Sequence, residues 1–157
     1  MNAGGELDEI IGEQVMGWER KVTDGGFQAW WRDGVEVVRM SEWQPSTGMA
    51  DAGQVLHRYT ELFPGRLMVV NHHAERWGEP AAIVEIDVPD NWRCWDRYVR
   101  AGVCEWERNG DRLFVYGTAV PHAICLAAWK AVDGGAVMWP YRQLLEWVSA
   151  ADNAIGP

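Results

Sequence analysis

PHAICLAAWKAV, residues 121–132, is the stretch of sequence that decides the fold. Proline suits the first turn of a helix, because its missing N–H would have no helical partner there. Alanines at four of the following positions give the helix small side chains, so it can approach a neighbouring element closely. Lys130 suits the negative end of a helix, and Asp133-Gly134-Gly135 ends it. We therefore expect one short, closely packed helix here.

Two further helices are predicted upstream of this stretch. The first is amphipathic, because apolar residues recur at spacings of three and four from Leu7 to Trp18, and Gly17 is expected to end it. The second begins at Pro45-Ser46-Thr47, where the hydroxyl groups suit an N-cap, and Pro64-Gly65 stops it. Its inner face is expected to consist of Ala52, Val55, Leu56, Tyr59 and Phe63.

Two hairpins are predicted where a turn dipeptide joins two β-rich runs. Asp33-Gly34 joins residues 27–31 to residues 35–40, and Asn109-Gly110 joins residues 103–107 to residues 113–116. The remaining expected elements are strands at residues 67–71 and 81–88, a short helix at residues 91–100, and a final helix in the tail. This order of helices and strands predicts an α+β fold in which an antiparallel sheet packs against helices.

The composition favours one globular domain and excludes several classes of protein. At 157 residues, the chain is too short for two ordinary domains, and its net charge of −9 argues against binding to duplex nucleic acid. Three cysteines without a CxxC pair indicate neither a zinc knuckle nor a disulfide framework, which fits a reducing cytoplasm. No stretch approaches the ~20 apolar residues that span a bilayer, so we expect no membrane partner.

Three blocks of the sequence resemble a known family. They are Leu7-Asp8-Glu9-Ile10-Ile11 leading to Val15-Met16-Gly17-Trp18, then Pro45-Ser46-Thr47, then the helix that starts at Pro121. Together they resemble small bacteriophage and prophage proteins that carry the phage ABA sandwich domain. The resemblance implies an α/β/α-type sandwich in a single domain, with an ABA sandwich-like domain at residues 1–135 and a C-terminal helical tail at residues 136–157. It implies a phage protein acting in the host cytoplasm.

The chain departs from this family in four places. Gly48 stands where an acidic residue usually follows the Ser-Thr pair, and Gly53 lies inside the same predicted helix. His122 occupies a usually aliphatic position, and a tail follows Val132. Each glycine weakens helix propensity by ~1 kcal/mol, so packing must hold the second helix together.

Tryptophan is unusually frequent in this chain. Because an aromatic side chain buries roughly 150–250 Å², we expect several of these rings to remain outside the core. They can line a concave surface as stacking platforms for a base or sugar, or they can serve as core and oligomer contacts. The eleven are Trp18, Trp30, Trp31, Trp43, Trp77, Trp92, Trp95, Trp106, Trp129, Trp139 and Trp147.

The best candidate site is the predicted start of the second helix. Ser46-Thr47-Gly48 offers unpaired N–H groups, two hydroxyls and a glycine that permits close approach, which together suit a phosphate. Trp43 supplies a stacking face, and arginines supply charge. Simple N-capping explains the same residues. The predicted ligand-binding residues are Trp18, Arg20, Arg39, Trp43, Ser46, Thr47 and Gly48.

No catalytic residue, metal site or cofactor is predicted. The sequence contains no P-loop, GxGxxG or GxSxG motif, and His72 and His73 on a strand point to opposite faces. We therefore expect the protein not to be an enzyme. The alternative is a hydrolase that uses His72, Glu85 or Asp87.

Two functions follow from these observations. The leading hypothesis is a non-enzymatic, homo-oligomeric phage protein that binds a small phosphorylated nucleotide, sequestering a second messenger of bacterial immunity as an anti-defence device. This rests on analogy with other phage proteins, since a fold does not determine a function. The second hypothesis is a protein–protein interaction module that inhibits a host factor or serves phage assembly, with exposed tryptophans as anchors.

Overall fold

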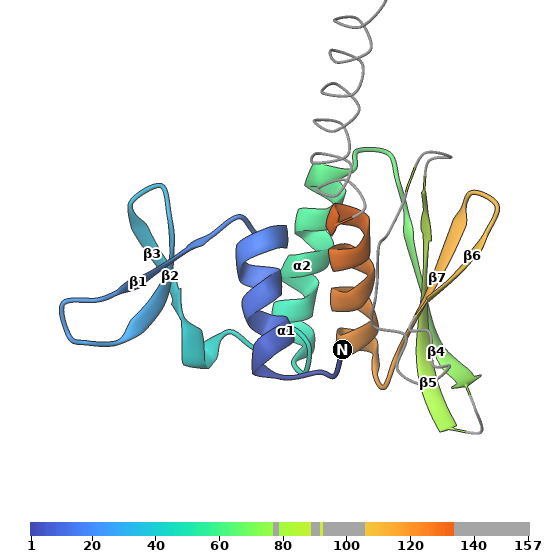
Figure 1. Ribbon diagram of the computed structural model, residues 1–157, viewed down its shortest axis with the longest axis horizontal. Helices are drawn as coiled ribbons and strands as arrows, with labels where there is room; N and C mark the ends of the chain where they lie inside the picture. Colours follow the sequence, from blue (N-terminus) through green and yellow to red (C-terminus); the bar gives the residue numbers. More distant parts are fainter. Residues whose placement is uncertain (77–78, 89–91, 93–105, 134–157) are drawn as a thin grey trace, which may run out of the picture.

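The helices of this protein lie between two antiparallel sheets (Figure 1). The computed structural model describes residues 1–76, 79–88, 92 and 106–133. A small sheet of three strands forms one side of the molecule, and a sheet of four strands forms the other. The predicted α+β class, with antiparallel sheets packed against helices in one domain, is confirmed.

All three predicted helices of the described region are present. The first consists of α1 (Gly5–Ile10), which continues as one π-helical turn, η1 (Ile11–Val15). It ends before Gly17, whose φ of 71° is the left-handed conformation that glycine adopts readily. The second is α2 (Met49–Leu62), and the third comprises residues 120–133. A short 3-10 turn, η2 (Met40–Glu42), precedes α2.

The small sheet contains the first predicted hairpin. Its strands are β1 (Glu19–Val22), β2 (Gln28–Arg32) and β3 (Val35–Arg39), in the order β1-β2-β3. Asp33 and Gly34 have φ of 51° and 78°, as a two-residue hairpin turn requires, so this prediction is confirmed. A bulge interrupts the pairing: Trp30 faces Val38 and Trp31 faces Glu36, which leaves Val37 as the extra residue.

The large sheet contains the remaining predicted strands. They are β4 (Met68–Arg76), β5 (Glu79–Asp87), β6 (Trp106–Asn109) and β7 (Arg112–Gly117), in the order β4-β5-β7-β6. The hairpin between β6 and β7 is confirmed, although its turn lies at Gly110 and Asp111, one residue later than predicted. Asn109 pairs with Arg112 and therefore closes the strand ladder.

The core lies between the large sheet and the helices. Alternate residues of β5, Ala82, Val84 and Ile86, are buried, as the alternation in the sequence predicts. The third helix is buried along its length, with the side chains of residues 121–131 enclosed. A Cβ atom at Gly117 would lie 2.5 Å from the Ala123 nitrogen, so β7 and this helix approach closely, as the alanines predict.

Packing also holds α2 together despite its glycines. Ala52, Val55 and Tyr59 are buried, as the predicted inner face requires. Gly48 is the N-cap of the helix, and Gly53 is exposed within it. No helix in the described part of the chain is long and apolar enough to cross a membrane. Apart from Trp92, the predicted helix at residues 91–100 lies outside the described residues, as do the domain boundary and the helical tail after residue 135.

Candidate functional site

The predicted hydroxyl cap of α2 does not form, and this prediction is wrong. Gly48 is the N-cap residue, and no side chain caps the helix. Ser46 lies earlier, in a turn, and is 1% exposed. Its hydroxyl accepts a hydrogen bond from the Gly4 N–H at 2.9 Å, and its own N–H donates to Oδ1 of Asp8 at 2.8 Å. These two hydrogen bonds therefore connect the N-terminal segment to the turn that contains Ser46.

Trp18 and Trp43 lie together, but they contact each other and leave little ring surface for a ligand. Their ring centroids are 4.7 Å apart with an edge-on geometry, and Trp18 also lies 6.3 Å from Trp30. Nε1 of Trp43 donates to the Asp8 carbonyl at 3.1 Å. Trp43 is 2% exposed and Trp18 is 6% exposed. Gly12 makes room for this cluster, because a Cβ there would lie 2.5 Å from the Trp30 ring.

Other described tryptophans also belong to the interior. Trp92 and Trp129 are buried, while Trp31 and Trp106 are half-buried. Nε1 of Trp129 donates to the Gln14 side chain at 3.1 Å. The other four, Trp77, Trp95, Trp139 and Trp147, lie outside the residues whose side chains the structure describes.

The two predicted arginines have partners of their own. Arg20 pairs with Glu9 and Glu13 of the first helix. Arg39 lies 4.4 Å from the centroid of the Phe27 ring, a cation–π geometry. Neither lines the depression beside Trp43. The structure therefore does not bring the predicted aromatic, hydroxyl and cationic groups into one pocket, and their role in ligand binding stays a prediction.

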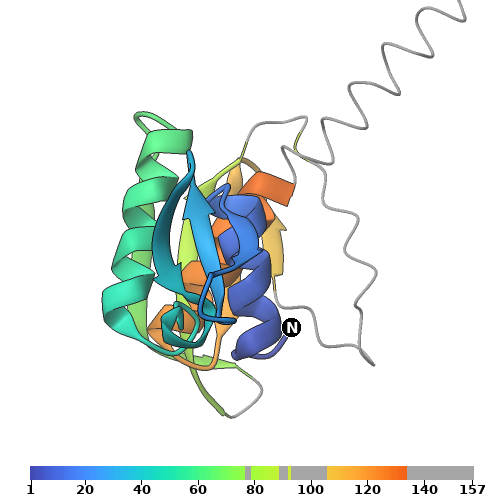
Figure 2. The ribbon, with the colours of Figure 1, turned by 90° about the vertical axis from the view of Figure 1, so that its left-hand side faces the viewer.

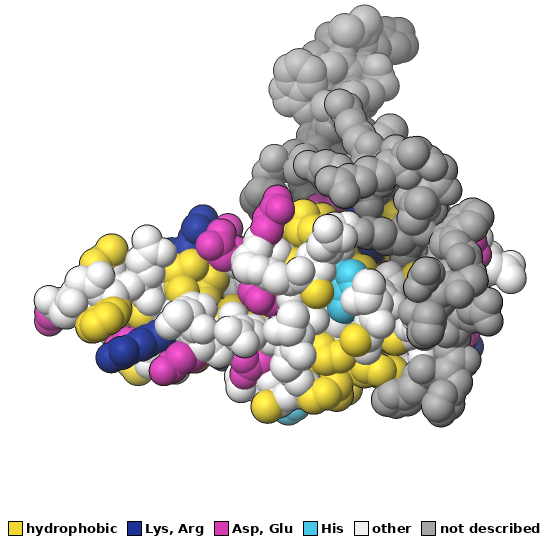
Figure 3. Space-filling model, turned by 90° about the horizontal axis from the view of Figure 1, so that it is seen from below, with side chains coloured by type: hydrophobic (Ala, Val, Ile, Leu, Met, Phe, Trp, Pro, Cys, Tyr) yellow, Lys and Arg dark blue, Asp and Glu magenta, His cyan; other side chains and the backbone are white. Residues whose placement is uncertain are grey.

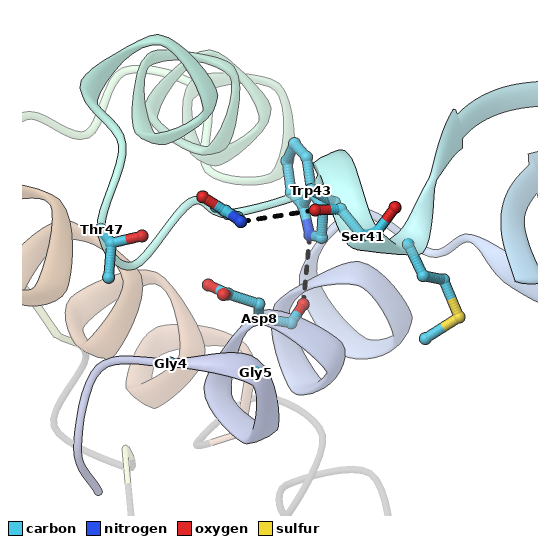
Figure 4. A pocket seen from close by; sticks show the side chains of 8 residues that line it. Gly4, Gly5, Asp8, Ser41, Trp43 and Thr47 are labelled. Atoms are coloured by element: carbon cyan, nitrogen blue, oxygen red, sulfur yellow. Dashed lines mark hydrogen bonds between the residues drawn. The ribbon is translucent and has the colours of Figure 1, made fainter.

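The depression beside Trp43 is unsuited to a phosphate (Figure 4). Asp8 is the one charged side chain among the described residues that line its volume of 310 Å³. A bound anion would therefore meet a carboxylate and gain no ion pair. Figure 4 shows Asp8, Trp43 and Thr47 around this space. Its lining consists of Gly4, Gly5, Asp8, Met40, Ser41, Trp43, Gln44 and Thr47.

A larger depression lies between α2 and the small sheet, and we call it the α2–β3 groove. Its volume is 580 Å³. Figure 2 shows α2 running alongside the small sheet. Apolar and charged groups both line it. The α2 residues form its helix wall, Arg32 and Val37 form its sheet wall, and the buried residues Met16 and Trp18 also line it. The full lining consists of Met16, Trp18, Arg32, Val37, Ala50, Gly53, Gln54, His57, Arg58 and Glu61.

The charges of the α2–β3 groove are arranged by short contacts. Arg58 is held in place, because its Nε donates to the Val15 carbonyl at 3.3 Å and its Nη1 pairs with Glu61 at 3.1 Å. Glu61 also lies 3.0 Å from Nε2 of His57. Arg32 is more loosely engaged, since its Nε lies 3.8 Å from the carboxylate of Asp33. The lining itself carries two guanidinium groups and one carboxylate, and each guanidinium group has a carboxylate neighbour.

Of the residues that line this groove, only Trp18 is among the predicted ligand-binding residues. One signal was available, because Gly53 stands inside a helix where a glycine is unfavourable. Arg58 and Glu61 show the spacing of an ion pair on a helix surface. The groove itself requires α2 and β3 to lie side by side, and no pattern within either segment specifies that.

Residues considered for hydrolysis are engaged elsewhere. Arg112 pairs with Glu85 at 2.9 Å and with Asp87 at 3.3 Å on the surface of the large sheet. Burial raises the pKa of the Cys125 thiol, so the reactive thiolate is disfavoured. Among the residues that the structure describes, no three histidine, cysteine or acidic side chains gather to hold a metal ion. The side chains of His72 and His73 are not described.

Comparison with known proteins assigns no family. No family model and no curated protein matches the chain. Among solved structures, the chain is similar to a phage protein from Bacillus cereus, with 17% identity and a TM-score of 0.46 over 82% of this chain and 90% of that one. A likeness this distant carries no argument about function. Membership of the phage ABA sandwich family is not confirmed and stays a prediction.

Proposed function

We propose that this chain is a non-enzymatic phage protein that acts in the host cytoplasm by binding a bacterial protein in the α2–β3 groove. The observation that carries the proposal is the groove itself, whose 580 Å³ volume is lined by both apolar and charged side chains. Concave sites that combine apolar lining with a few polar groups bind ligands, and an apolar centre with a polar rim is the composition of a protein interface. Inhibition of a host factor and service in phage assembly are both compatible with this mode of action.

Exposed apolar side chains next to the groove support a protein partner. Val37 lines the groove and is 43% exposed, and Val35 on the same strand is 66% exposed. Met49 is exposed at the start of α2. Figure 3 shows hydrophobic side chains among charged ones on the end of the molecule that the small sheet forms. An apolar centre with charged neighbours is the composition of a specific protein interface.

The proposal is tested by capture of a partner with matched variants. Immobilised wild-type protein should retain one host protein in stoichiometric amount from a bacterial lysate. Arg32→Glu should abolish this retention by reversing a charge in the groove, while Lys21→Glu makes the same charge reversal on β1, outside the groove. Equal retention by the Arg32 variant, or no stoichiometric partner at all, would contradict the proposal.

Capture of a phosphorylated nucleotide is the second candidate. The α2–β3 groove carries Arg32 and Arg58 on one lining, and guanidinium groups bind phosphate. Sequestration of an immune second messenger, as an anti-defence function, would use this groove in place of the depression beside Trp43. A homo-oligomer is compatible with either candidate.

Calorimetry separates the two candidates. Cyclic nucleotides and ADP-ribose-type signals are titrated into wild-type protein and into Arg58→Gln, which removes one guanidinium charge. Heat release that disappears in the variant supports nucleotide capture, and intact nucleotide recovered afterwards excludes hydrolysis. If no nucleotide of the panel releases heat at high micromolar concentration, nucleotide capture is rejected and the protein partner remains the proposed function.

A further inference from the structure

The sheet wall of the α2–β3 groove is the edge of a sheet. In the order β1-β2-β3, β3 pairs with β2 on one side, and no strand in the described part of the chain pairs with its other side. An unpaired strand edge presents backbone N–H and C=O groups that can pair with an added strand. The bulge at Val37 directs this extra residue into the groove. The wall therefore offers backbone hydrogen-bonding groups together with an apolar side chain.

The helix side of the groove carries two very small residues. Ala50 and Gly53 are its smallest lining residues, and a Cβ at Gly53 would meet no heavy atom within 4 Å. Glycine weakens the interior of a helix, and alanine would fit this position without a clash. The missing methyl group lets another backbone approach α2 closely. An extended chain needs this width between a strand edge and a helix, because its side chains project to both sides.

The charge of the groove selects among extended chains. Arg32 and Arg58 outnumber Glu61 among the lining residues, and Glu61 is shared between His57 and Arg58. The Arg32 guanidinium is loosely engaged, because its Nε lies 3.8 Å from the exposed carboxylate of Asp33. The chain as a whole carries a net charge of −9, so this excess of positive charge is local. Apolar lining from Met16 and Val37 requires apolar groups on the partner as well.

We infer that the α2–β3 groove binds an extended peptide segment by strand addition to β3, and that this segment carries acidic side chains between apolar ones. The inference rests on the proposed function and names the partner's chemistry. Strand addition gives affinity through main-chain hydrogen bonds, while the groove reads alternate side chains. The acidic side chains pair with Arg32 and Arg58, and the apolar side chains cover Val37 and Met16.

The test begins with a library of random linear heptapeptides displayed on yeast and selected against the wild-type protein. We expect selected peptides to alternate acidic and apolar residues. Arg32→Glu should weaken their binding by ~10-fold or more, because it places a like charge in the groove. Lys21→Glu should leave their affinity unchanged. Selection of basic peptides, or of no peptide, would overturn the inference.

Two further measurements separate strand addition from other modes of binding. Upon binding of a selected peptide, the amides of β3 should become protected from hydrogen exchange. Gly53→Ala should weaken peptide binding while raising the melting temperature, and a purely structural effect would not combine these two signs. A groove-dependent host partner without protection of β3 would overturn strand addition and leave the proposed function standing. Loss of both groove-dependent capture and peptide selection would overturn both.

Discussion

The two sheets of this protein share the same hairpin chemistry and differ in what covers them. In the large sheet, alternate residues of β5 and β7 are buried against the helices. In the small sheet, β1 is exposed throughout, and the sheet is anchored mainly through Ala29 and Trp30 of β2. The large sheet therefore supplies most of the core, whereas the small sheet keeps its edges accessible.

The largest expected effect tests whether one strand anchors the small sheet. Trp30→Ala should destabilise the protein by about 3–5 kcal/mol, because a buried indole is replaced by a cavity. Val35→Ala, on the exposed strand β3, should change stability by less than about 0.5 kcal/mol. Urea denaturation followed by circular dichroism measures both. Similar losses in the two variants would show that the small sheet is stabilised along its whole width.

The next effect tests the close contact on the side of the large sheet. Gly117→Ala should cost about 1–3 kcal/mol, because the new methyl group would lie 2.5 Å from the Ala123 nitrogen, a backbone atom that cannot rotate away. The same denaturation experiment measures it. An unchanged stability would mean that β7 and the 120–133 helix can separate without loss, and the contrast between the two sheets would weaken.

A pH dependence should originate where β7 joins the third helix. Burial lowers the pKa of His122, whose Nδ1 accepts a hydrogen bond from the Thr118 N–H at 3.0 Å and whose Nε2 lies 2.8 Å from the Met1 carbonyl. The unfolded chain therefore takes up the proton first. Stability from this site is complete above pH 6.5 and is lost as the pH falls below it, by at most about 1.4 kcal/mol per pH unit.

The measurement for His122 is a series of melting curves between pH 5 and pH 8, compared with those of His122→Asn. Asparagine keeps a hydrogen-bonding side chain and removes the titration. Its curves should show a shallower loss toward acid than wild type. Parallel curves for the two proteins would place the acid sensitivity elsewhere.

The smallest expected effect concerns the helix wall of the groove. Gly53→Ala should stabilise the protein by about 0.5–1 kcal/mol, because alanine favours the helix and the position is open. Thermal denaturation measures this gain. A loss of stability would show that the fold itself requires Gly53, and that this glycine is not kept for a binding partner.

Local patterns predicted the elements of this fold well. Asp33-Gly34 specifies a turn by its own backbone preferences, and the spacing along residues 121–132 specifies a helix, so both were predictable from short windows. The N-cap at Ser46 failed for a different reason. Gly4 lies 42 positions away in sequence, and its N–H donates to the Ser46 hydroxyl that would otherwise cap the helix, while the Ser46 N–H donates to the Asp8 carboxylate. A short stretch of sequence does not show whether a side chain will bond to a neighbouring backbone group or to a residue far away in the chain.

The candidate site was less predictable than the fold. The number of tryptophans predicts exposed rings, but Trp18, Trp30 and Trp43 pack against one another in the interior. The absence of a side chain at Gly12 leaves room for the Trp30 ring, and a count of tryptophans does not show this. The α2–β3 groove depends on how a hairpin and a helix from different parts of the chain lie together. Only Trp18 belongs to both the predicted site and the groove.

The contact between Gly12 and the Trp30 indole has a consequence for recognising distant relatives. Any side chain at position 12 would overlap the ring, so the two positions are constrained as a pair. A homologue with alanine or serine at position 12 should carry a smaller residue at position 30. Such coupled exchange offers a signature of common ancestry that persists after overall identity has faded.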